Sequence, residues 1–179
     1  MKSRIKLWLY FGFLYLFAAF LSAGLIFAYD VTLCAPFDVS MARGLSFRDF
    51  AALTYRFLRP LLLIGLGSFT LFSCGISSLS CLYCGVLMGQ LTMSYCLAGL
   101  NPFTHAAALV FLLGNGVLFV VLSVQSALHR NRLKAVVPDP KALIRDKKTI
   151  AFLYSLLSVC LIGIFLAGAL YFFLCYFPL

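Results

Sequence analysis

The longest uncharged stretch of the chain is residues 60–128, which read PLLLIGLGSFTLFSCGISSLSCLYCGVLMGQLTMSYCLAGLNPFTHAAALVFLLGNGVLFVVLSVQSAL. It contains no Lys, Arg, Asp or Glu. A water-soluble domain needs charged side chains on its solvated faces, so a run of this length is incompatible with one. At about 1.5 Å per helical residue the stretch is roughly 100 Å long, enough for about three crossings of a 30 Å hydrocarbon core. It therefore predicts an integral membrane protein.

Composition agrees with this class. The chain has 179 residues, of which 64% are hydrophobic and 11% charged, and its mean hydropathy is +1.06. Ordinary soluble domains are about 45–50% apolar and about 25% charged. The net charge of +9 arises from Lys and Arg between the apolar segments. Their position indicates membrane boundaries and anionic phospholipid, so we expect no nucleic-acid partner.

The apolar segments predict an all-α, polytopic membrane domain that spans residues 1–179. We expect five transmembrane helices, at about 7–29, 59–74, 80–99, 104–128 and 149–174. A Gly/Ser interruption at residues 75–80 divides 60–100 into a short Gly-rich helical hairpin. Each half of this hairpin either crosses the membrane or re-enters from one side, shielded by protein.

Residues 46–59 predict an amphipathic helix within the loop 30–58. Apolar side chains recur there at i, i+3, i+4 and i+7, and Arg48, Arg56 and Arg59 fall away from that face. We expect this helix to lie in the membrane interface and to run into the second span. The arginines then form either a surface for a partner protein or a lipid anchor, and we favour the anchor.

Basic residues predict the orientation. Segments 1–6 and 129–148 hold three and seven Lys or Arg, whereas 30–59 holds four. The positive-inside rule places the first two segments in the cytoplasm, and four spans between them keep them on one side. We therefore expect a multi-pass membrane protein with a cytoplasmic N-terminus, a cytoplasmic basic loop at 129–148 and an external C-terminus.

The best candidate for a polar intramembrane site is Asn115, flanked by Gly114 and Gly116. An amide in hydrocarbon is unfavourable unless it is paired, and glycines allow another helix to approach closely. Asn115 forms either an interhelical hydrogen bond, which we favour, or a site for a partner helix or permeating solute. Gln90 has the same two interpretations.

Cys81 and Cys84 form a CxxC motif, which can do redox chemistry or supply half of a zinc site. No second CxxC or His pair accompanies it, so we interpret both as packing residues and expect no metal or cofactor. The sequence also offers no matched acid, base and nucleophile. We therefore expect a protein that is not an enzyme.

The layout resembles the stage II sporulation protein M family. Besides the order of spans and loops, the resemblance rests on the Gly-rich region 65–99 and on Leu113-Gly114-Asn115-Gly116. Many members of that family carry a Glu three residues after this last Gly, where this chain has Phe119. The resemblance implies a membrane subunit that holds extracytoplasmic peptidoglycan-degrading partners during sporulation.

Together these features predict a non-enzymatic membrane scaffold that binds other membrane or extracytoplasmic proteins. If the resemblance holds, these partners are cell-wall hydrolases. The scaffold can also form homo-oligomers. The alternative is a membrane subunit of a transporter. A polar cavity that reaches Asn115 and Gln90 from one side would favour transport, and a dry, packed interior would favour the scaffold.

Overall fold

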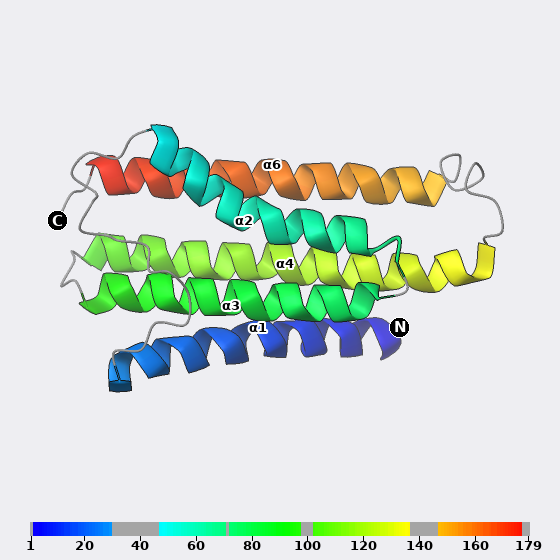
Figure 1. Ribbon diagram of the computed structural model, residues 1–179, viewed down its shortest axis with the longest axis horizontal. Coiled ribbons are helices and arrows are strands. Elements are labelled where there is room, and N and C mark those ends of the chain that lie inside the picture. The colour runs from blue at the N-terminus through cyan, green and yellow to red at the C-terminus, as the bar shows by residue number, and fades with distance from the viewer. Residues whose placement is uncertain (1, 30–46, 71, 98–101, 137–146, 177–179) are drawn as a thin grey trace.

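The computed structural model describes residues 2–29, 47–70, 72–97, 102–136 and 147–176. These residues form five long helices (Figure 1): α1 (Lys2–Tyr29), α2 (Phe47–Gly67), α3 (Ser73–Leu97), α4 (Pro102–Val136) and α6 (Lys147–Tyr176). Each contains a segment that is long and apolar enough to cross a membrane. The prediction of an all-α, multi-pass membrane protein with five spans is confirmed.

The helices lie side by side and alternate in direction (Figure 1). α4 packs against all four other helices, and α3 packs against α1, α2 and α4. The start of α1, the turn between α2 and α3, the end of α4 and the start of α6 share one end of the bundle. We call it the basic end, because it carries Arg4 and Lys6 of α1 and Lys147 and Lys148 of α6.

The turn of the predicted Gly-rich hairpin lies earlier than expected. α2 ends at Gly67, and residues 75–80 are part of α3 rather than a break. The hydroxyl groups of Ser68 and Thr70 donate to the carbonyl oxygens of Gly65 and Gly67, which supplies partners for the end of α2. Helices of 21 and 25 residues are long enough to cross the bilayer, so re-entrant geometry is not needed.

The predicted amphipathic helix at 46–59 is present, but only as the first part of α2. The helix continues through Pro60, and its membrane-length segment is Phe50–Gly67. It packs along α6, where a Cβ on Gly163 would lie 3.4 Å from Leu61. The expected interfacial helix and the expected span at 59–74 are therefore one helix within the bundle, because proline is tolerated in membrane helices when neighbouring groups satisfy the backbone.

The other boundaries differ at the polar ends. α4 extends eight residues beyond the predicted end at 128 and includes the basic positions 130–134. It starts at Pro102, a residue favoured in the first turn of a helix. The predicted loop residues 30–46 and 137–146 lie outside the described residues.

α1 docks against α3 through small residues. A Cβ on Gly89 would collide with the Ala19 carbonyl oxygen and the Ser22 hydroxyl, and a Cβ on Gly85 would collide with the Tyr15 carbonyl oxygen. Ser22 Oγ also donates to the Val86 carbonyl oxygen at 3.0 Å. The Gly85-x-x-x-Gly89 spacing thus brings two helix backbones into contact, as small-residue motifs do in membranes.

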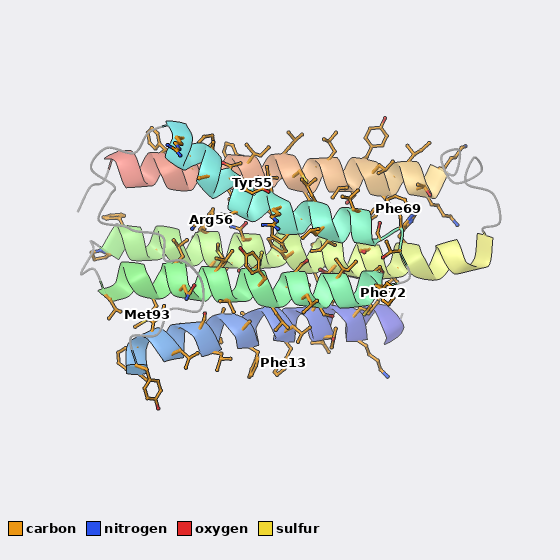
Figure 2. The ribbon with its side chains drawn as sticks, in the orientation of Figure 1. Phe13, Tyr55, Arg56, Phe69, Phe72 and Met93 are labelled. Carbon is orange, nitrogen blue, oxygen red and sulfur yellow. The ribbon has the colours of Figure 1, made fainter. Side chains whose placement is uncertain are left out.

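The outer faces of α1 and α6 carry large apolar side chains. Figure 2 shows Phe13 extending away from the bundle, and 66% of its surface is exposed. Phe20 and Phe165 are exposed to a similar degree. In a bilayer these faces contact lipid chains, so their exposure agrees with the membrane assignment.

Candidate functional site

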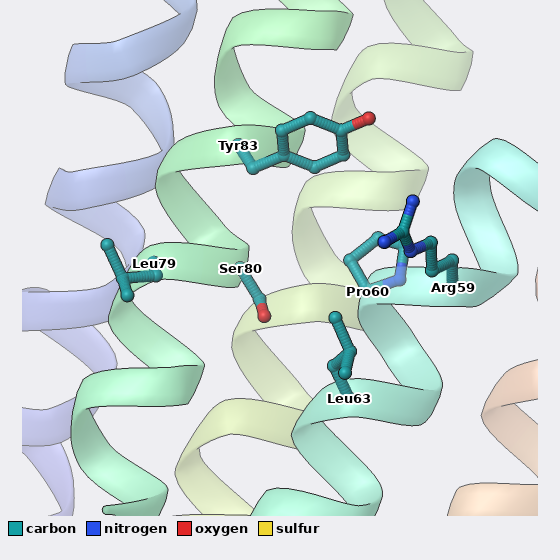
Figure 3. A pocket seen from close by; sticks show the side chains of 6 residues that line it. All are labelled: Arg59, Pro60, Leu63, Leu79, Ser80 and Tyr83. Atoms are coloured by element: carbon teal, nitrogen blue, oxygen red, sulfur yellow. The ribbon is translucent and has the colours of Figure 1, made fainter.

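A cleft between α2 and α3 contains the most unusual side chain of the spans, an arginine. Its volume is about 290 Å³. Figure 3 shows the six residues that line it: Arg59, Pro60, Leu63, Leu79, Ser80 and Tyr83. Arg59 and Tyr83 extend from the two helices toward the same space. We call this the Arg59 cleft.

The Arg59 cleft lies near the middle of the membrane-length segments Phe50–Gly67 and Ser73–Met93. Arg59 is eight residues before the end of α2 at Gly67, which is about 12 Å at 1.5 Å per residue. Tyr83 is ten residues after Ser73, or about 15 Å from the same end of the bundle. Half of a 30 Å hydrocarbon core is also about 15 Å. A lysine or arginine located at either end of a helix could not place its charge at this depth. The charge in the cleft therefore belongs to a residue in the middle of α2.

Two arginines lie in the membrane-length part of α2. Arg56 is partly buried and Arg59 is exposed, and residues three apart are neighbours on a helix surface. Among the side chains that the structure describes, neither forms an ion pair. An arginine at the centre of a membrane helix costs about 2.5–3.5 kcal/mol on insertion scales. The positive charge at the cleft is therefore not paired with an acidic side chain in the described part of the chain.

The third arginine of the predicted set is separate from the other two. Arg48 is exposed and lies next to the start of α2, before the segment Phe50–Gly67. It is thus positioned for a membrane surface, while Arg56 and Arg59 are not. The predicted arginine surface is divided between two depths, because α2 runs through the bundle.

Asn115 lies in the middle of α4 and is 1% exposed. Its Nδ2 donates to the Phe111 carbonyl oxygen at 2.9 Å, one turn earlier in the same helix. Its Oδ1 is buried and has no hydrogen-bond partner in the described part of the chain. Among the described residues, this amide therefore forms no interhelical hydrogen bond of the predicted kind.

Gln90 is also buried, at 5% exposure, and its Nε2 has no partner among the described residues. Cys81 Sγ and Ser123 Oγ, 3.2 Å apart, set the antiparallel register of α3 and α4. Gln90 is nine residues after Cys81, and Gly114 is nine before Ser123, so Gln90 and Asn115 lie at about the same depth. The register brings the two predicted amides to one level of the bundle.

The glycines beside Asn115 have different surroundings. A Cβ on Gly116 would lie 2.6 Å from the Tyr15 ring, whereas one on Gly114 would make ordinary contact with Leu166 at 3.5 Å. The Tyr15 hydroxyl donates to the Leu112 carbonyl oxygen at 2.8 Å. Because Gly116 has no side chain, the Tyr15 ring of α1 can pack directly on the surface of α4. Gly116, which we predicted as part of a polar site, is therefore a packing residue.

Both amides are buried at this level of the bundle. The lining of neither the Arg59 cleft nor the pocket described below includes Asn115 or Gln90. Cys81 and Cys84 are both fully buried in the apolar core. Groups of three or more His, Cys, Asp or Glu that could hold a metal ion do not occur among the described residues.

The sequence contained signals for features that we did not predict. The spacing of Gly85 and Gly89 is a known helix-association pattern. We expected Arg59 in the membrane interface, where the helix 46–59 runs into the span that begins at 59, and therefore did not predict an arginine within a span. The Arg59 cleft itself depends on the position of the turn, which residue types in 61–80 do not determine.

Comparison with protein-family models, with curated proteins and with solved structures found no match.

Proposed function

We propose that the protein is a non-enzymatic membrane subunit that binds a partner protein through the Arg59 cleft. The observation that supports this proposal is an arginine near mid-membrane, exposed on the bundle and without an ion-pair partner in the described part of the chain. Intramembrane charges are unfavourable and usually pair or mark a functional site. A second protein that supplies the opposite charge would remove this cost.

The partner that fits the cleft is a transmembrane helix with an Asp or Glu near its centre. A carboxylate can accept two hydrogen bonds from one guanidinium, a geometry that lysine does not reproduce. Leu63, Leu79 and Ser80 offer an apolar wall and a hydroxyl group beside Arg59. This mixture suits a helix surface with one acid among aliphatic residues.

The resemblance to the stage II sporulation protein M family extends this proposal. It would make the partner a membrane-attached protein of a cell-wall-degrading complex, in the bacterial cytoplasmic membrane and with the basic end in the cytoplasm. The alternative function, a transporter subunit, is less favoured because Asn115 and Gln90 are both buried in a packed interior.

The test is site-specific photo-crosslinking in native membranes. A crosslinking residue at Leu63 or Leu79 should capture one partner, while the same residue at Phe17 or Phe165, on the lipid-facing sides of α1 and α6, should not. Arg59→Leu should reduce the crosslinked product at least tenfold and leave protein abundance unchanged. Equal crosslinking with Arg59→Leu would contradict the proposal.

A charge exchange then tests the chemistry of the contact. Once the captured partner is known, Arg59→Asp should abolish the complex, and an arginine in place of the partner's intramembrane acid should restore it. Restoration is specific to a direct ion pair, because a folding defect in either protein would not be repaired by a second change. A partner without an intramembrane acid would exclude this binding mode.

A further inference from the structure

A second pocket, at the basic end, brings together cationic side chains from two helices. Its volume is about 290 Å³, and its lining consists of Arg4, Gln125, Leu128, His129, Lys148, Ala151, Phe152 and Ser155. Arg4 belongs to α1, residues 125–129 to α4 and residues 148–155 to α6. α4 packs against both other helices and joins them.

The pocket lies at the level of the membrane surface. Arg4 and His129 are the ends of the membrane-length segments Arg4–Tyr29 and Leu109–His129, and Lys148 is the second residue of Lys147–Ala169. Lipid phosphates lie at this level, just outside the hydrocarbon core. A ligand here can therefore place a charged group beside Arg4 and Lys148 and still contact the bilayer.

The polar chemistry of the pocket suits an anion. Neither lining cation forms an ion pair within the described residues, and none of the described residues that line the pocket is acidic. Ser155 Oγ donates to Gln125 Oε1, so the Gln125 NH2 is the part of that amide that can donate to a ligand oxygen. The first turns of α1 and α6 also lack acidic residues, and their positive helix ends face the same end of the bundle.

The rest of the pocket is rigid and apolar. The His129 ring stacks on Phe152 with centroids 4.8 Å apart, and the edge of Phe69 packs against both rings. Leu128 and Ala151 complete this wall. Beside it, α1 and α6 carry exposed apolar side chains such as Ile5 and Ile150, against which acyl chains can lie.

We propose that this pocket binds the phosphate group of an anionic phospholipid. The proposal is independent of the Arg59 cleft, which lies between other helices near mid-membrane. Basic pockets between transmembrane helices on the cytoplasmic side bind anionic head groups in this way. A phospholipid and inorganic phosphate both carry the phosphate group that these cations would bind. Only the phospholipid also carries acyl chains, which distinguish the two ligands.

The test is a titration of the purified full chain in detergent micelles with fluorescent phosphatidylglycerol. The double variant Arg4→Gln/Lys148→Gln should weaken binding roughly 30-fold, since each of the two cations that line the pocket contributes about fivefold. The matched control is Lys6→Gln/Lys147→Gln, which removes the same charge from the same two helices outside the pocket lining. It should change binding less than threefold.

Three results would overturn the proposal: equal losses in the two double variants, equal binding of zwitterionic phosphatidylcholine, or displacement of the lipid by inorganic phosphate at micromolar concentration. The third result would assign the pocket to a free phosphate instead. Arg4→Lys/Lys148→Arg keeps both charges and should bind within threefold of the original chain, so loss of binding in this variant also counts against the proposal.

Discussion

Single buried polar atoms are the most informative features at the residue scale. Asn115 Oδ1 is enclosed without a partner in the described part of the chain, although its Nδ2 bonds to its own helix. Gln125, by contrast, accepts a hydrogen bond from Ser155 of α6. These two amides on one helix therefore have opposite expected contributions to stability.

Replacing Asn115 with Leu should leave the free energy of unfolding unchanged or raise it by up to about 1–3 kcal/mol, because the change removes a buried acceptor without a partner. Replacing Gln125 with Leu should lower it by about 0.6 kcal/mol, the average for an interhelical hydrogen bond in membranes. Unfolding of both variants by SDS in mixed micelles measures the difference. A loss of more than about 1 kcal/mol for Asn115→Leu would mean that its oxygen has a partner, such as a buried water.

At the scale of single elements, α3 carries two kinds of glycine. Gly85 and Gly89 are covered by the backbone of α1, whereas a Cβ on Gly75 would meet nothing within 4 Å. The first two allow close approach of α1 and α3, and the third has no such role. Helix docking here depends on position within the helix and not on glycine content.

Gly89→Ala should therefore destabilise the protein by at least about 1–3 kcal/mol, the usual cost of overpacking, because the colliding atoms belong to the backbone of α1 as well as to Ser22. Gly75→Ala in the same helix should be neutral within about 0.5 kcal/mol or slightly stabilising. Thermal unfolding in detergent, followed by fluorescence, compares the two. Equal effects would show that glycine flexibility, and not contact with α1, determines the result.

The number and type of the helices followed from the sequence, because long apolar segments have few alternatives in a membrane. The turn after α2 did not, since Gly and Ser break helices in water but are tolerated inside membrane helices, and Gly75 and Ser77 both lie within α3. Buried residues such as Asn115 were identified by their unusual polarity. The Arg59 cleft could not be predicted, because it requires two helices to be aligned in depth.

At the scale of the whole molecule, alternation of the helices fixes which ends lie together. The start of α1, the turn at 68–72 and the start of α6 share the basic end, while Arg48 lies at the opposite end of the bundle. The positive-inside rule places the basic end in the cytoplasm. This orientation remains a prediction.

Single cysteines test the orientation in a background from which the seven native cysteines have been removed. Cysteines at Lys6, Thr70 and Lys147 should react with a membrane-impermeant maleimide only after the cells are opened. A cysteine at Arg48 should react in intact cells. Labelling of Lys147 and Arg48 from the same side would contradict the alternation, and the reverse pattern at all four positions would invert the orientation.

The helices pair in an order different from the order in which the ribosome makes them. α1 packs mainly on α3, and α2 packs on α6, the last helix to be synthesised. During insertion, α1 therefore lies in the lipid without α3, its main partner, while α2 is inserted, and the contact of α2 with α6 forms only when synthesis is nearly complete. Nascent chains halted before α6 would expose the face of α2 that packs on α6, including Leu61 beside Gly163, which makes them targets for membrane chaperones and proteases. Biogenesis thus depends on late contacts, and damage to α6 should act by removing the protein from the cell.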